Sequence, residues 1–196
     1  VFVLVVAATI GLAVGLTAGF FGGKADAIFM RITDVFLAFP ALLLAVALAA
    51  VLTASAFNAA VAIAATWWPW YARLARAQAA SIRHQGYSDA ARVIGASRTR
   101  QVVRHVLPNA ATPVFVQMSL DGAGIILTAA TLSYLGLGAQ DPTPEWGLMV
   151  SQGQSLATTA WWVVTFPGLA ILLTAAAFNF IGDGLQTALD PKRGGR

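Results

Sequence analysis

Long apolar runs separated by polar segments organise this chain from end to end. Five runs are rich in Ala, Leu, Val and Ile, and most approach the roughly 20 residues that an α-helix needs to cross a bilayer. They cover residues 1–21, 35–54, 57–71, 112–137 and 161–181. The pattern predicts an all-α fold: a polytopic bundle of about five transmembrane helices that forms a single membrane domain over residues 1–196.

Composition assigns the chain to a lipid bilayer. Hydrophobic residues make up 58% of the sequence and charged residues only 10%, whereas about a quarter of the residues in a soluble domain are charged. The chain contains no cysteine, which excludes disulfides, thiol catalysis and cysteine-ligated metal sites. Its first residue, Val1, lies in an apolar run without a basic leader. We therefore expect an N-terminally truncated sequence rather than a signal peptide.

The basic residues predict the orientation of the chain. All 12 Lys and Arg residues follow the first, third or fifth apolar run: Lys24 and Arg31; Arg73, Arg76, Arg83, Arg92, Arg98, Arg100 and Arg104; Lys192, Arg193 and Arg196. The connections around Ser55 and over residues 138–160 contain none. Lys and Arg accumulate on the cytoplasmic side of membranes. The loop after the third run and the C-terminus are therefore predicted to be cytoplasmic, Val1 is predicted to be outside, and one upstream crossing would give about six helices.

Two features inside the apolar runs stand out. Gly11, Gly15 and Gly19 recur at every fourth position, which leaves one helix face without side chains and predicts close packing against another helix. Asp121 lies within the fourth run, and an ionisable group at membrane depth is a functional candidate by default. Asp121 either faces a solute path or pairs with a neighbouring helix.

The polar stretch over residues 72–111 predicts a structured cytoplasmic element. Ser88 is placed to cap a short helix, Asp89 complements the positive end of its dipole, and Gly95 is placed to end it.

A second short helix is predicted from Ser97 to Pro108, with an apolar stripe opposite two arginines. The stripe consists of Val102, Val103 and Val106, and the arginines are Arg100 and Arg104. Two short helices joined at a glycine either dock into the groove of a partner protein or lie on anionic headgroups.

Five segments resemble one known family. YSDAARVIGASRTRQVVRHVLPNA is similar to the EAA loop of permease subunits of binding-protein-dependent ABC importers, in the form found in the dipeptide and oligopeptide (peptide/nickel) subfamily. The same resemblance extends to DVFLAFPALLLAVALAAVL, WPWYARLARAQ, LSYLGLGAQDPTPEWG and FPGLAILLTAAAFNFIGDGLQTALDP. It covers nearly all of the chain and implies the type I permease fold, with the coupling loop at about 84–110.

The resemblance also implies partners and a place. The expected partners are a second, different permease subunit, two cytoplasmic ATPase subunits that bind the ATP, and an extracytoplasmic solute-binding protein. The expected location is the bacterial or archaeal plasma (inner) membrane, with no cofactor held by this chain. The solute class implied is dipeptides or oligopeptides, with nickel and other small solutes also carried by relatives.

Within the loop, the resemblance implies that Asp89, Ala90, Ala91 and Gly95 contact an ATPase subunit. Arg92 and Arg98 are further candidates, and Leu107 and Pro108 end the loop. The family usually has Glu at the position of Asp89, a change that keeps the charge and shortens its reach. The subfamily commonly has Glu where this chain has Ala129, so a role of that carboxylate does not carry over to this chain.

Other functional classes fit the sequence less well. An ATP site of its own would need GxxxxGK[ST], and the nearest segment, Gly22-Gly23-Lys24-Ala25, lacks both the first glycine and the hydroxyl residue. An ion-coupled transporter or channel, the alternative reading, normally places several ionisable groups near the membrane midplane. Catalytic or metal-binding roles find no support, because His84 and His105 lie in the basic loop without HExxH spacing. The clustering of basic residues between apolar runs fits membrane topology better than nucleic-acid binding.

Overall fold

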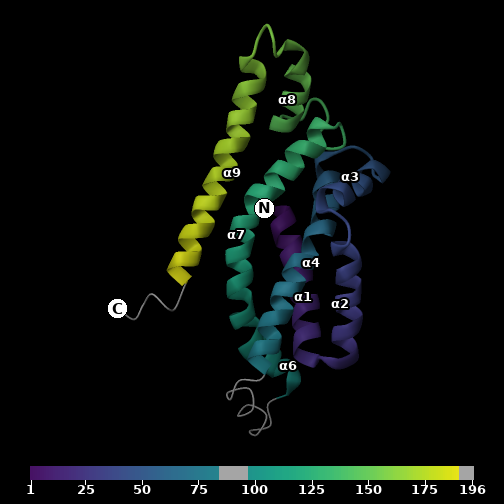
Figure 1. Cartoon of the computed structure of the whole chain (residues 1–196), viewed down its shortest axis with the longest axis vertical. Coiled ribbons are helices and arrows are strands. Elements are labelled where there is room, and N and C mark those ends of the chain that lie inside the picture. The colour runs from purple at the N-terminus through teal and green to yellow at the C-terminus, as the bar shows by residue number, and fades with distance from the viewer. Residues whose placement is uncertain (84–96, 190–196) are drawn as a thin grey trace. The chain divides into compact units, whose positions relative to one another are not determined.

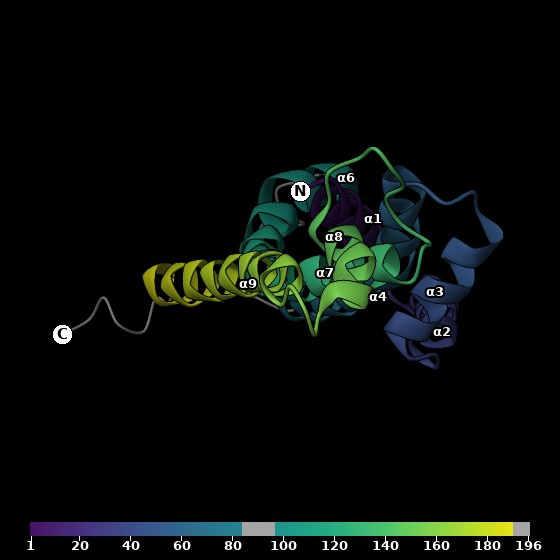
Figure 2. The ribbon, with the colours of Figure 1, turned by 90° about the horizontal axis from the view of Figure 1, so that it is seen from above.

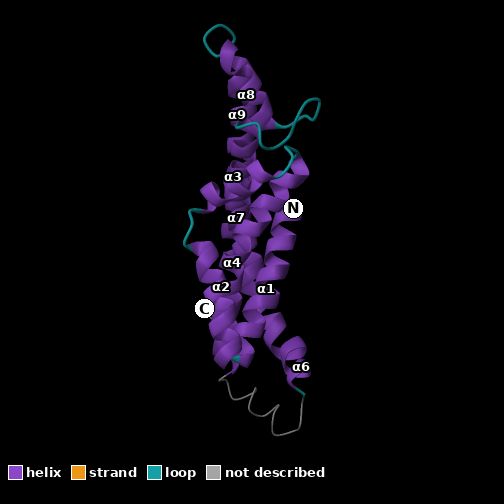
Figure 3. Cartoon of the chain, turned by 90° about the vertical axis from the view of Figure 1, so that its right-hand side faces the viewer, coloured by secondary structure: helices purple, strands orange, loops and turns teal. Residues whose placement is uncertain are grey.

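The computed structural model describes residues 1–83 and 97–189, and over that part of the chain every regular element is a helix (Figure 3). The elements are α1 (Phe2–Phe21), α2 (Gly23–Leu37), α3 (Ala41–Val51), α4 (Ala56–Arg83), α6 (Arg98–Gln101), the π-helical turn η1 (Val102–Val106), α7 (Leu107–Tyr134), α8 (Trp146–Gly153), the 3-10 turn η2 (Gln154–Leu156) and α9 (Trp162–Leu189). The all-α prediction is confirmed for the described residues.

The described helices form two compact units. One unit contains residues Val5–Phe39 and Trp67–Gln117, and we call it the α1–α2 unit. The other contains Val1–Leu4, Pro40–Thr66 and Met118–Arg196, and we call it the α8–α9 unit. Helices α4 and α7 each begin in one unit and end in the other.

In the α1–α2 unit, α1 and α2 run beside the second half of α4 (Figure 1). Its buried cluster contains Leu16 and Phe20 from α1, Ala79 and Ile82 from α4, and Val106 and Ala110 from η1 and α7. Trp68 is also buried, with its ring edge on Phe36 at a centroid distance of 5.3 Å. This tryptophan therefore packs inside the unit.

In the α8–α9 unit, α8 lies beside α9 and the end of α7 (Figures 1 and 2). Glu145 begins α8, because its side chain accepts a hydrogen bond from the Leu148 amide at 2.8 Å. Gly147 permits the close approach, since a methyl group there would collide with the backbone of Ala130 in α7. The positive φ of 78° at Gly136 turns the chain out of α7.

Among the residues that the structure describes, length and composition identify three helical runs that can cross a membrane: α1, the continuous run Arg98–Tyr134 and the α9 segment Trp162–Ala188. A fourth candidate is the interrupted pair α2 and α3. The prediction of one helix over residues 35–54 is therefore wrong. Pro40 is the extended N-cap of α3, and proline disfavours helical backbone at the residue before it. Helix α4 covers the third run but does not meet the same test; it carries three arginines and three tryptophans.

The segment before α7 also differs from the prediction. The helix begins at Ser97 as predicted, and the Ser97 side chain caps α6 by accepting a hydrogen bond from the Arg100 amide at 3.3 Å. The helix does not end at Pro108, which lies instead in the first turn of α7. Proline is tolerated in the first turn of a helix because the backbone N–H that it lacks would have no acceptor within the helix there. The preceding turn is π-helical, with the Leu107 amide donating to Val102, and this wider turn accommodates the proline without ending the run.

Candidate functional site

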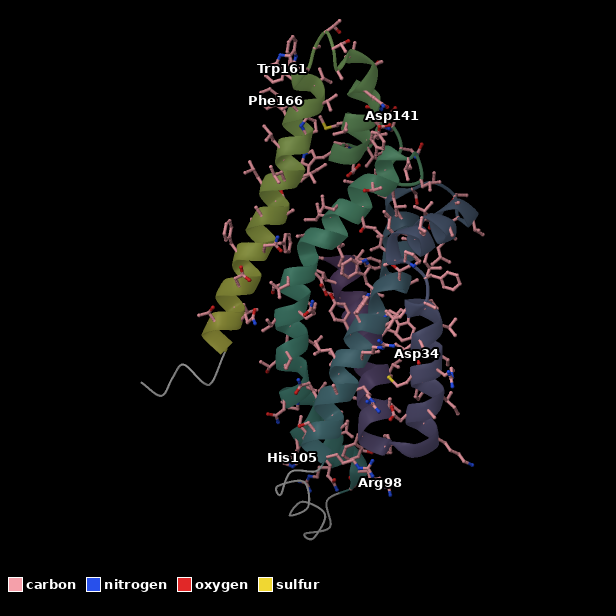
Figure 4. All side chains as sticks on the ribbon, in the orientation of Figure 1. Asp34, Arg98, His105, Asp141, Trp161 and Phe166 are labelled. Atoms are coloured by element: carbon pink, nitrogen blue, oxygen red, sulfur yellow. The ribbon has the colours of Figure 1, made fainter. Side chains whose placement is uncertain are left out.

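The predicted coupling loop is described only at its stems. Asp89, Ala90, Ala91, Arg92 and Gly95 lie outside the described residues, as do His84 and Ser88. The structure describes the end of α4, which leads into the loop, and the α6–η1–α7 run, which leaves it and carries Arg98, Leu107 and Pro108. Figure 4 shows Arg98 and His105 at the same end of the α1–α2 unit.

The stem that enters the loop is fixed to α1. Ile82 is 5% exposed and packs with Leu16 and Phe20. The next residue makes a further contact with α1. The Arg83 guanidinium donates a hydrogen bond, at 3.4 Å, to the carbonyl of Phe21, the last residue of α1. Gly22, with φ of 66°, leaves space for this contact, because a methyl group there would lie 2.6 Å from Nη1 of Arg83. A basic side chain that donates to the last carbonyls of a helix stabilises the C-terminus of that helix.

The stem that leaves the loop packs on the same residues. Val106 and Ala110 are fully buried in the Leu16 and Phe20 cluster, and Val102 and Leu107 pack against its edge. Val103 is 54% exposed, so the predicted valine stripe is narrower than expected. A π turn rotates successive side chains differently from an α turn, and this moves Val103 off the buried face.

The glycine face of α1 lies directly on α4. A methyl group on Gly11 would lie 2.8 Å from the Trp68 carbonyl oxygen, one on Gly15 would lie 2.8 Å from the Arg76 nitrogen, and one on Gly19 would lie 2.8 Å from the Ala79 Cβ. The opposing face of α4 is lined by the fully buried alanines Ala72, Ala75 and Ala79. Small residues on both helices bring the two backbones together.

Two ion pairs, which the sequence analysis missed, join α2 to α4. Arg76 donates to both carboxylate oxygens of Asp26, at 3.0 and 2.6 Å, and Arg73 donates to Asp34 at 2.7 Å. Asp34 lies on the side of α2 that faces α4 (Figure 4). The sequence offered two aspartates in one segment and two arginines in another, but their spacings of eight and three positions correspond to about 12 and 4.5 Å along a helix. The pairing therefore could not be predicted from spacing.

Asp121 lies within α7 and is half-buried, with its Oδ2 atom buried. The residues on either side of it contact α9. A methyl group at Gly182 would lie 2.5 Å from the Leu120 side chain, and Gly122 lies against the ring of Phe178. Asp121 therefore lies in the part of α7 that packs on α9.

The connection between α7 and α9 is built around α8. Both Asp141 carboxylate oxygens accept hydrogen bonds from Gln152 at 2.7 Å. An open apolar pocket of about 220 Å³ lies between α7, α8 and α9, lined by Leu127, Ala130, Thr131, Tyr134, Gly147, Val150 and Ile171. Among the described residues, no three acidic, histidine or cysteine side chains gather as a metal site would require.

Comparison with known proteins finds one family and several similar relatives. The family described as "Binding-protein-dependent transport system inner membrane component" matches residues 11–195. The "Probable D,D-dipeptide transport system permease protein DdpC" of Escherichia coli (strain K12) is 50% identical over 194 residues, 99% of this chain and 65% of the relative. The "Di/tripeptide transport system permease protein DppC" of Pseudomonas aeruginosa (strain UCBPP-PA14) is 45% identical over 182 residues, 93% of this chain and 60% of that relative.

A third relative, the "Dipeptide transport system permease protein DppC" of Escherichia coli (strain K12), is 50% identical over 165 residues, 84% of this chain and 55% of the relative. The chain thus spans between about half and two thirds of the length of these relatives. The match includes the segment that resembles the EAA loop and both of its stems. The chain belongs to the family of binding-protein-dependent transport system inner membrane components.

Proposed function

We propose that this chain is the membrane-spanning permease part of an ATP-driven importer of dipeptides or oligopeptides. The observation that carries the proposal is the packing of both stems of residues 84–96 on one buried cluster of α1. A loop held at both ends by the same helix transmits a displacement into that helix instead of absorbing it. Such a connection suits coupling to a partner protein, because alternating access needs a two-state element that the partner can bias.

The mechanical path continues from α1 into α4. The glycine face of α1 and the alanine face of α4 are in backbone contact, and closely packed backbones move as one body because there is no side-chain layer to deform. Arg76 and Arg73 then connect α4 to α2 through their aspartates. A displacement at the loop therefore moves α1, α2 and the adjoining half of α4 together.

The energy source in this proposal is a pair of separate cytoplasmic ATPase subunits. The chain lacks a GxxxxGK[ST] segment of its own. Asp89, Ala90, Ala91 and Gly95 form the proposed contact, supported by Arg92 and Arg98. Small alanines allow close approach of the partner, and the Asp89 carboxylate accepts charge-assisted hydrogen bonds.

The remaining partners follow from the family. We propose a second, different permease subunit and an extracytoplasmic solute-binding protein, with the loop and the C-terminus on the cytoplasmic side as the distribution of Lys and Arg favours. The printed names of the relatives support dipeptides as the solute class.

Asp121 is the proposed solute-path residue. A free peptide carries a cationic amino terminus, and a half-buried carboxylate within a membrane helix attracts such a group. Asp121→Asn is expected to raise the KM for peptide uptake with little change in the amount of assembled complex.

Reconstituted uptake tests the proposal. The full-length protein, assembled with its partner permease, ATPases and binding protein in proteoliposomes, is expected to accumulate labelled dipeptide only when ATP is present. An imposed proton or sodium gradient without ATP is the control. Uptake driven by the gradient alone would overturn the proposal in favour of an ion-coupled transporter.

A further inference from the structure

Helix α2 separates its charges onto two sides. Asp26 and Asp34 are engaged by Arg76 and Arg73 of α4. Lys24 and Arg31 are exposed, and the ion pairs of α2 within the described residues use only its aspartates. The acidic groups are thus neutralised against α4, and two cations are left on the outer face.

The two cations share that outer face with apolar side chains. Lys24, Ile28, Arg31 and Val35 follow one another at spacings of four, three and four residues, which places them on one side of an α-helix. Ile28 is 60% exposed, Val35 56% and Ile32, beside them, 46%. Buried Thr33 lies on the opposite side.

The two cations can act on one group. Seven residues of helix separate Lys24 from Arg31 by roughly 10 Å along the axis. Helical side chains lean toward the N-terminus, so the long Arg31 side chain reaches back toward the turn that carries Lys24. The apolar side chains continue from this basic end toward the C-terminal end of α2.

We propose that the outer face of α2 binds an anionic phospholipid, with its phosphate between Lys24 and Arg31 and an acyl chain along Ile28, Ile32 and Val35. A membrane component of this family meets lipid wherever a helix face is uncovered. Lys24 and Arg31 form no ion pair among the described residues, and a face with two such cations beside apolar side chains complements an anionic headgroup with its tail. A lipid with a neutral headgroup would contact the apolar side chains of this face but would supply no counter-charge for the two cations. The inference concerns the bilayer and does not rest on the transported solute.

Lipid selectivity tests it in the assembled full-length complex. The complex is placed in phosphatidylcholine membranes with spin-labelled phosphatidylglycerol or spin-labelled phosphatidylcholine, and the protein-associated fraction of each probe is measured. The native complex is expected to prefer phosphatidylglycerol. The double variant Lys24→Gln, Arg31→Gln is expected to lose the preference at its α2 site, by roughly fivefold per removed cation.

The matched control removes the same charge elsewhere. Arg100→Gln with Arg104→Gln also deletes two exposed cations from the α1–α2 unit and is expected to leave the preference unchanged. The conservative pair Lys24→Arg, Arg31→Lys is expected to retain it, which separates loss of charge from loss of fold. An equal loss of preference in both glutamine variants would mean that net charge alone sets the preference. An unchanged preference in Lys24→Gln, Arg31→Gln would mean that α2 holds no such site. Either result overturns the proposal.

A second measurement distinguishes lipid from a protein occupant. Residues 1–196 contain no cysteine, so in a full-length protein with any cysteine outside them replaced, Ile28→Cys introduces a single attachment point for a spin label. In the assembled complex, the label is expected to be accessible to oxygen dissolved in the bilayer. Protection from oxygen on assembly, with cross-linking to a partner subunit, would show that a protein covers the face and would refute the lipid site.

Discussion

Ile82, at the end of α4, and Val106, in the π turn before α7, pack in the same buried cluster against Phe20 of α1. The segment that resembles a coupling loop lies between them in sequence. The described residues on either side of that segment therefore pack against one helix, α1.

Val106→Ala is expected to lower the free energy of unfolding by about 2 kcal/mol, because it leaves a cavity in a fully buried site. Val103→Ala is the matched control, since it makes the same change in the same turn at an exposed position. It is expected to change stability by less than about 0.5 kcal/mol. Thermal unfolding of the full-length protein in detergent measures both. Equal effects would show that the two valines are not packed differently.

Gly15→Ala is expected to destabilise the protein by about 1–3 kcal/mol, because the added methyl group would lie 2.7 Å from the Ala75 Cβ and 2.8 Å from the Arg76 nitrogen. Gly168→Ala in α9 has open space around the new methyl group. It is expected to stabilise the helix by about 0.5–1 kcal/mol, since alanine is a better helix former than glycine. Opposite signs in thermal unfolding support direct contact of α1 with α4, and two stabilising results would argue against it.

The Asp26 and Arg76 pair is expected to show a favourable coupling energy of about 1 kcal/mol in a double-mutant cycle with Asp26→Asn and Arg76→Gln. Both oxygens of Asp26 are engaged, and its side chain is 23% exposed. The Asp34 and Arg73 pair has a single hydrogen bond and side chains 48% and 52% exposed, so its coupling is expected to be smaller. A larger coupling for Asp34 and Arg73 would contradict this ranking.

Glu145→Ala is expected to destabilise α8 by about 0.5–2 kcal/mol, because the Leu148 amide loses its acceptor. Glu145→Asn is expected to retain most of the stability, since asparagine is also a good N-cap. Hydrogen exchange at the first amides of α8 measures the effect. Equal protection in the two variants would show that the cap does not hold the helix.

The sequence was informative where a pattern had one physical meaning. The glycine repeat of α1 predicts close packing because no side chain stands between the backbones, and the helix predicted from Ser97 begins at that residue. Apolar periodicity was less informative over residues 22–54. Apolar periodicity does not show where a helix breaks. The charged residues of α2 are also typical of a polar connection, and their ion pairs with α4 depend on tertiary structure.

The packing of the two stems of the candidate site also could not be predicted from the sequence. Val102, Val103 and Val106 fit one α-helical stripe, but the π turn over Val102–Val106 turns Val103 outward. The convergence of Ile82 and Val106 on Phe20 depends on contacts between segments far apart in the chain. Such contacts follow from tertiary packing, which local spacing does not encode.

The most direct test of the central claim is co-purification of the full-length protein with its ATPase subunits. Asp89→Arg reverses the charge of the proposed contact, and Gly95→Trp places a large side chain at the proposed bend; Val103→Ala is the control outside it. The account predicts that the native and control proteins retain the ATPases, while both loop variants lose them and still insert in the membrane. Retention of the ATPases by both loop variants would contradict the assignment of this segment as the coupling loop.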